Sequence, residues 1–171
     1  GDFTETGAVL SSKVVYWDDE RDWQGIVSTP ATDESQRVKY SLSYEEDPDG
    51  VSIIEGSLRK YKITTTTCYV YNNNSEEELK YLFTFRGDNS TRIDVDRLRS
   101  AVVYKTNGED IDYVLNTKGT AIKTKTKYTY TLLSILDYTI ERKVTDGSIT
   151  TGTNLSAWTL VEPDIANAGE I

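Results

Sequence analysis

The sequence predicts a mainly β fold: a single antiparallel β-rich domain, built as one sheet or as a two-sheet sandwich, with one or two short helices. Two long segments, residues 58–71 and 121–140, are rich in Thr, Tyr and Lys, and residues 37–44 alternate apolar and polar side chains. Thr and Tyr suit a pleated, half-wet surface because each joins an apolar body to a hydroxyl group. Strict alternation is typical of a strand with one buried face.

Alternate side chains of an extended chain share a face. The second segment is therefore expected to carry one face made of Ile122, Thr124, Thr126, Tyr128, Tyr130 and Leu132. Its other face should carry a lysine ladder of Lys123, Lys125 and Lys127, followed by Thr129 and Thr131. The first segment should place on a single face Tyr61, Ile63, Thr65, Thr67, Tyr69 and Tyr71. Such a face is either the solvated side of a sheet or a surface for a hydroxyl-rich ligand such as a glycan.

Further strands are expected at residues 8–17, 37–44 and 51–55, with a turn over the Pro- and Gly-containing residues 45–50. Hairpin-type turns are expected at two further pairs, Asn107-Gly108 and Asp146-Gly147.

Two capping boxes, Ser75–Glu78 and Thr91–Asp94, predict short helices near residues 76–82 and 92–101. Acidic side chains in the first turn of each favour this interpretation, because the helix dipole stabilises negative charge there. Residues 79–85 also alternate as a strand does, so the first helix is expected to yield to a strand.

At 171 residues the chain suits one domain over residues 1–171, with an ordered part at about 8–161 and a loose tail at 162–171. It contains no Met, and we interpret it as a piece of a longer polypeptide. The net charge of −9 argues against nucleic acid and anionic membrane as partners, since both reward positive charge. No apolar run reaches the roughly 20 residues of a membrane helix, so no membrane insertion is expected.

Catalysis is not expected. The sequence has no His and no motif of a nucleophilic, phosphate-binding or zinc site, so it predicts no catalytic residue, no cofactor and no metal. The acidic residues Glu45, Asp47 and Asp49 resemble the start of a calcium loop, but Gly56 stands where the bidentate ligand belongs, and we expect an ordinary acidic turn.

The lone Cys68, in an alternating segment, is expected to be a buried thiol. Glycosylation triplets begin at Asn73, Asn89 and Asn154 and suggest exposed loops.

The densest group of ligand-binding side chains comprises Trp17, Arg21 and Trp23, interspersed with the acidic residues Asp18, Asp19, Glu20 and Asp22. Aromatic faces and charged groups of this kind can bind a sugar. The alternative is that one or both Trp side chains fill the core at the end of the sheet. The second candidate glycan site is the face that carries Tyr61, Tyr69 and Tyr71. The lysine ladder could pair with an acidic sugar, or it could protect an exposed strand from pairing with a neighbour.

Residues Val102–Arg142 resemble the C-terminal strands of the glycan-binding head of the rotavirus outer-capsid spike protein. The similarity lies in VVYKTNG, IDYVLNTKGTA and KTKYTYTLLSILDYTIER, where a Tyr-containing strand leads through an Asn-Gly hairpin into a second strand and then a Thr- and Tyr-rich one. The resemblance implies a galectin-like two-sheet sandwich that binds cell-surface carbohydrate, with the remainder of the spike polypeptide as a further partner. It places the domain at the virion surface. The two expected helices depart from that pattern, and no sugar-contacting residue can be transferred.

Two functions therefore stay open at this point. One is noncatalytic glycan binding in viral attachment. The other is a structural or protein-interaction domain of a larger surface protein, extracellular or at the cell surface, with no sugar ligand.

The Trp17–Trp23 segment leads to a first prediction. Trp23→Ala should leave the thermal midpoint nearly unchanged and remove binding on a glycan array, because millimolar affinity corresponds to only about 4 kcal/mol and one stacking aromatic contributes a large part of it. A collapsed midpoint would place Trp23 in the core, and unchanged binding by a stable variant would contradict the site.

Overall fold

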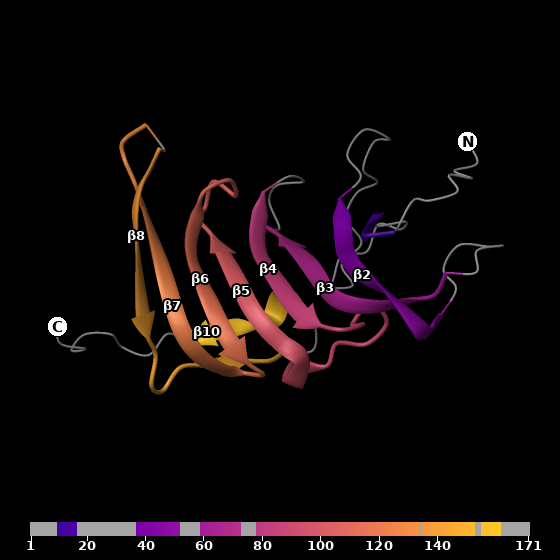
Figure 1. Ribbon diagram of the computed structural model, residues 1–171. Helices are drawn as coiled ribbons and strands as arrows, with labels where there is room; N and C mark the ends of the chain where they lie inside the picture. Colours follow the sequence, from indigo (N-terminus) through magenta and orange to yellow (C-terminus); the bar gives the residue numbers. More distant parts are fainter. Residues whose placement is uncertain are drawn as a thin grey trace.

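The described part of the chain is a sheet of ten antiparallel strands, which confirms a mainly β fold (Figure 1). The computed structural model describes residues 10–16, 37–51, 59–72, 78–133, 135–152 and 155–161. Its strands are β1 (Ser12–Tyr16), β2 (Val38–Val51), β3 (Tyr61–Tyr71), β4 (Leu79–Arg86), β5 (Leu98–Tyr104), β6 (Ile111–Lys118), β7 (Ala121–Tyr130), β8 (Leu136–Lys143), β9 (Ser148–Thr150) and β10 (Thr159–Val161). Two three-residue 3-10 helices, η1 (Val95–Arg97) and η2 (Leu155–Ala157), complete the described elements.

The first seven strands form a meander in which each strand pairs with the next one in sequence. The outer edge of β7 is shared by two later strands. Residues Thr124–Tyr130 pair with β8, and Ala121 pairs with Ser148 at the start of β9. Strand β10 then pairs with β9, and the chain carries β10 and η2 behind the middle strands (Figure 1).

The tight turns follow from residues that adopt positive φ. Gly108 has a φ of 68° and donates its N–H to the Lys105 carbonyl, which confirms the predicted hairpin turn between β5 and β6. The predicted hairpin at Asp146-Gly147 is wrong, because the strands on either side of it, β8 and β9, do not pair with each other. The Gly147 carbonyl instead accepts the Ile122 N–H, which turns the chain across the end of β7.

One face of the sheet, which we name the covered face, holds the core. Paired residues of neighbouring strands point the same way, and a buried row crosses the sheet in this order: Cys68, Phe83, Ala101 and Leu115. Trp158 lies over this row with its ring centroid 5.2 Å from that of Phe83 and 6.1 Å from that of Phe85. Only 4% of Trp158 is exposed, so it joins η2 and β10 to the sheet.

The buried Cys68 was predicted correctly. Its side chain is completely covered in the core, and burial raises the pKa of the thiol to about 12. A group in this setting behaves as a small apolar side chain.

The two expected helices have different outcomes. The strand expected at 79–85 is confirmed as β4, so the first helix is not found in residues 79–82, and residues 73–77 lie outside the described part. The helix expected at 92–101 is wrong over most of its length. In the 92–101 segment only η1 is helical, capped by the Asp94 carboxylate, which accepts the Asp96 N–H. From Leu98 the chain extends into β5, because Leu98, Ala101 and Val103 are all buried on the covered face. Burial against the sheet therefore outweighs the local helix-start signal.

The predicted strand at 37–44 is confirmed and continues further than expected. Glu46 and Val51 both lie opposite Tyr61, so the residues between them form a wide bulge within β2. The Asp47 carboxylate accepts the Asp49 N–H at 3.0 Å, which closes a local turn there. The Lys62 ammonium group bridges Glu45 (2.6 Å) and Asp47 (3.2 Å), so these carboxylates form ion pairs with a lysine.

The expected 8–17 strand appears as β1, whereas residues 52–55 and the tail 162–171 lie outside the described part.

Bulges also correct the predicted faces of the two long segments. Thr64 is an extra residue in β3, since Thr65 lies opposite Ser43 and Ile63 lies opposite Tyr44. The bulge moves Tyr61 to the covered face, away from Tyr69 and Tyr71. Lys123 is an extra residue in β7, and it separates the buried Ile122 from the Thr124 face in the same way. Leu132 lies beyond β7 in a turn and is fully exposed.

The two faces predict opposite results for two aromatic truncations. Phe83→Ala should lower the free energy of unfolding by about 3–5 kcal/mol, as large core truncations do. Tyr130→Ala should lower it by about 1 kcal/mol or less, since Tyr130 lies on the other face and its described ring contact is the Lys105 ammonium group 4.0 Å from the ring centroid. Urea denaturation of both variants measures this difference, and equal losses would contradict the assignment of the faces.

Candidate functional site

The second face of the sheet, which we name the open face, carries a row of hydroxyl and amide side chains. The row runs directly across six strands in this order: Ser41, Thr67, Thr84, Ser100, Asn116 and Thr124. Asn116 is exposed and the other five are half-buried. With strands about 4.8 Å apart, the row is roughly 24 Å long. It is therefore a continuous polar strip on a rigid support.

Neighbouring groups within this polar strip touch one another. The Asn116 amide donates a hydrogen bond to the Thr124 hydroxyl at 2.9 Å, and the hydroxyls of Thr67 and Thr84 are 3.4 Å apart. A hydroxyl group can donate and accept at once, so each of these groups retains capacity for a further partner.

A second row, less polar, lies beside the strip on the same face. Its members are opposed across five strands in this order: Tyr69, Leu82, Val102, Val114 and Thr126. All five side chains are half-buried. The open face therefore combines a hydroxyl strip with an apolar strip of similar length.

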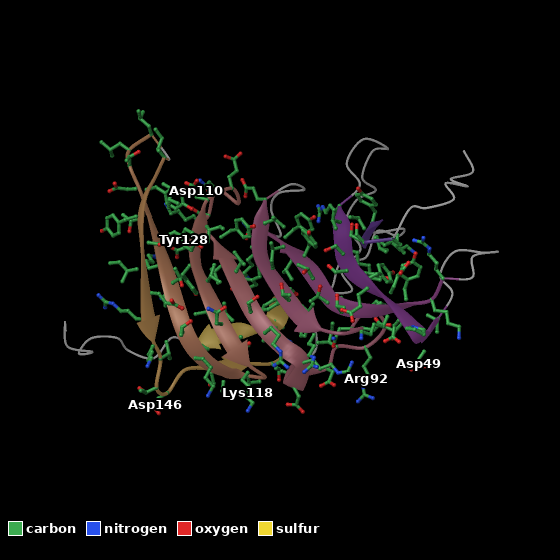
Figure 2. All side chains as sticks on the ribbon, viewed as in Figure 1. Asp49, Arg92, Asp110, Lys118, Tyr128 and Asp146 are labelled. Carbon is green, nitrogen blue, oxygen red and sulfur yellow. The ribbon has the colours of Figure 1, made fainter. Side chains whose placement is uncertain are left out.

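Tyrosines gather toward one end of the open face, partly within the apolar row and partly beyond it. Tyr104 lies two residues after Val102 on β5, and Tyr128 lies two residues after Thr126 on β7. Figure 2 shows Tyr128 at the same end of the strands as Asp110, with Lys118 at the opposite end. We name Tyr69, Tyr104, Tyr128 and Tyr130 the tyrosine cluster.

The titration of Tyr104 reflects this environment. Burial raises the pKa of the Tyr104 phenol, and the neighbouring phenols of Tyr69 and Tyr130 raise it further. Burial also raises the pKa of Tyr130, partly offset by a backbone hydrogen bond from Ile111. The phenols of Tyr104 and Tyr130 therefore stay protonated at neutral pH and can act as hydrogen-bond donors.

The structure brings together only part of the predicted tyrosine site. Tyr61 is 1% exposed and its hydroxyl accepts the Leu10 N–H at 3.3 Å, so it serves the interior. Tyr71 is half-buried, and its hydroxyl accepts the Val38 N–H at 3.1 Å. Tyr69 lies within the open face. The first-choice residues, Trp17, Arg21 and Trp23, lie outside the described residues and remain predictions.

The lysine ladder is divided by the Lys123 bulge. Lys125 and Lys127 point to the covered face, where with Ile140 and Arg142 they line a cavity of about 280 Å³. The Lys127 ammonium group pairs with the Asp112 carboxylate, and that of Lys125 lies 4.1 Å from the centroid of the Tyr113 ring. Strand β7 is paired on both sides, so the lysines do not protect a free edge. Pairing with an acidic sugar remains a prediction.

Asn89 departs from the exposure that its glycosylation triplet suggested. Its side chain is 1% exposed, and its amide oxygen accepts the Asp94 N–H at 2.8 Å. The Asn89 N–H in turn bonds the buried Thr66 hydroxyl at 3.0 Å. This residue therefore shapes the β4–β5 connection and is closed to modification in the folded chain.

Sequence reasoning missed Thr84, Ser100, Tyr104 and Asn116 as members of a common surface. Alternation within each strand gives the face that a residue shares with its own neighbours, but the pairing register decides which strands align their polar residues. Bulges at Thr64, Arg99 and Lys123 change that register, and nothing in the local composition marks them.

Comparison with protein-family models, with curated proteins and with solved structures found no match to this chain. Among the described residues, no group of three or more His, Cys, Asp or Glu side chains is arranged to hold a metal ion. None of the helices in this part of the chain has the length and apolar character needed to cross a membrane.

The Tyr104 phenol predicts a pH dependence. Its pKa in the folded state lies above the ordinary value of about 10, so the folded chain keeps this proton at a pH where the unfolded chain has lost it. The stability that this group contributes is complete below about pH 10 and is lost as the pH rises through the folded-state pKa.

Tyr104→Phe should therefore reduce the fall in unfolding free energy above about pH 10 while leaving the value at pH 7 similar. Urea denaturation midpoints at a series of pH values measure this. Parallel curves for the variant and the unchanged protein would contradict a buried Tyr104 phenol.

Proposed function

We propose that this chain is a noncatalytic glycan-binding domain that receives its ligand on the open face. The observation that carries the proposal is the hydroxyl and amide row from Ser41 to Thr124, with the tyrosine cluster on the same face. The sequence resemblance suggests the setting: attachment of a virus to cell-surface carbohydrate by the head of an outer-capsid spike. In this proposal the second face of one sheet is left for the ligand, in place of the two-sheet sandwich that the resemblance implies.

The chemistry of the open face suits a sugar. A sugar presents hydroxyl groups around its rim, which require partners that both donate and accept, and C–H surfaces that pack on aromatic rings. The polar strip offers the first kind of group and the tyrosine cluster the second. Because the groups lie on paired strands, little conformational entropy is lost when they bind.

The energies involved fit a weak, multivalent ligand. A net hydrogen bond contributes about 1 kcal/mol, and millimolar affinity requires about 4 kcal/mol in all. A few contacts along the strip therefore account for single-site binding, and several copies of the domain on one surface would add avidity.

One feature favours the alternative, a protein-interaction domain without a sugar ligand. Leu82, Val102 and Val114 form the middle of the apolar row and are only half-buried. Aliphatic side chains in the centre of a sheet face suit a second protein layer better than a hydroxylated ligand.

A glycan array with the purified domain, supported by NMR titration, separates the two functions. Binding to one glycan family, with shifts at Thr84, Ser100 and Asn116, supports the proposal. Silence across neutral and sialylated sugars would favour the protein-interaction domain.

A matched pair of variants tests the location. Asn116→Ala removes an exposed amide from the polar strip, and it should weaken glycan binding about fivefold, which corresponds to about 1 kcal/mol, with little change in stability. Lys118→Ala, two residues further along β6 and also exposed, should bind as the unchanged protein does. Equal affinities for both variants, measured by NMR titration, would move the site away from the strip.

A further inference from the structure

Strand β8 is an edge strand that little of the chain covers. All eight of its residues are exposed, and it pairs through one edge with β7. In the described part of the chain no strand pairs with its other edge. Three large apolar side chains contribute to this exposure: Leu136 at 50%, Tyr138 at 51% and Ile140 at 42%. A free edge with apolar side chains is a template for another strand.

The charges of β8 narrow the choice of partner. An acid, Asp137, stands near the start of the strand, and near its end Glu141 is followed by two bases, Arg142 and Lys143, so the net charge is negative at the start and positive at the end. Charges on an edge strand discourage indiscriminate pairing. A strand with opposite charges at its two ends, however, is complementary to an antiparallel copy of itself, so these charges select one partner and reject others.

Only one register of β8 with itself satisfies the charges and the faces. In the dimer, residues that lie opposite one another across a two-fold axis perpendicular to the sheet share a face. The axis must therefore pass midway between one residue and the same residue of the second copy. Centring on Thr139 opposes Asp137 to Glu141, and centring on Glu141 opposes that acid to itself. Centring on Tyr138 opposes Leu136 to Ile140, which lie on different faces because Leu136 pairs with Tyr130 and Ile140 with Lys127.

Centring on Ile140 gives a consistent set of pairs. Ile140 meets its own copy, and Tyr138 lies opposite Arg142. Asp137 is an extra residue in β8, because Tyr138 lies opposite Thr129 and Leu136 lies opposite Tyr130. Counted back from Tyr138, Asp137 falls on the same face as Lys143 and lies opposite that residue of the copy. Tyr138, Ile140 and Arg142 all point to the covered face, since they oppose Thr129, Lys127 and Lys125 of β7. This register joins apolar to apolar, an aromatic ring to a guanidinium, and an acid to a base at both ends.

We propose that β8 pairs with β8 of a second copy of this chain, antiparallel and centred on Ile140, to form a two-fold dimer with one continuous sheet. The dimer brings Tyr138 and Ile140 of each copy against the other β8 and satisfies the free backbone edge of both copies. The axis is perpendicular to the sheet, so both open faces lie on the same side of the dimer. The dimer does not depend on what the open face binds.

Sedimentation or light scattering over a range of protein concentrations tests the dimer. The unchanged protein should shift from 19.3 kDa toward twice that mass as its concentration rises. Asp137→Lys should weaken the dimer at least tenfold, because it places one lysine opposite another. Lys143→Asp should weaken it similarly, because it places one aspartate opposite another. The double variant should restore the dimer, and an equimolar mixture of the two single variants should form a mixed dimer.

Matched controls change the same charge elsewhere. Glu109→Lys and Lys118→Asp alter exposed residues away from β8 and should leave the dimer unchanged. Ile140→Lys should abolish it while the far-ultraviolet circular dichroism stays the same. The proposal is overturned if the unchanged protein remains a monomer at several hundred micromolar. It is also overturned if a dimer forms but the charge exchange fails to rescue it.

Discussion

Trp158 fills the space above Phe83 and Phe85, and through it the last described elements of the chain cover the middle of the sheet. A sheet is stable only when one of its faces is buried against another layer. In the described part of the chain that layer is small, consisting of η2, β9, β10 and the indole ring between them (Figure 1). The contact decides which face is closed, and among the described elements none forms a layer over the opposite face.

Bulges decide which residues reach each face. Single extra residues at Thr64, Arg99 and Lys123 reverse the alternation within β3, β5 and β7. Without the Lys123 bulge, Ile122 could not be buried while Thr124 stays on the polar strip. The open face is thus a product of local irregularity in strands that otherwise read as regular. The same irregularities bring Ser41, Thr67, Thr84, Ser100, Asn116 and Thr124 into line.

Much of the sheet could be predicted from the sequence, because the alternation at residues 37–44 and the Thr-Tyr segments is a strong local signal for β2, β3 and β7. The Asn107-Gly108 turn and the burial of Cys68 could also be predicted from the sequence. The helix at 92–101 was wrong because burial of Leu98 and Ala101 against neighbouring strands is not visible in a capping pattern. The polar strip could not be predicted, because it depends on the pairing register. Alternation alone groups Tyr61 with Tyr69, because the Thr64 bulge leaves no mark in the composition. The register is a tertiary property and lies outside what one strand encodes.

The position of Trp158 after all the strands of the meander has a consequence for biosynthesis. The strands of the meander emerge from the ribosome in order and can pair as they appear, because each one follows its partner directly. Phe83, Phe85 and Leu115 nevertheless remain without their cover until the chain has been made as far as residue 158. A nascent chain at that stage presents a broad apolar sheet surface to its surroundings, which is the kind of surface that chaperones recognise and on which aggregates form. Formation of β9 and β10 and the packing of Trp158 therefore cover the apolar surface that the meander exposes.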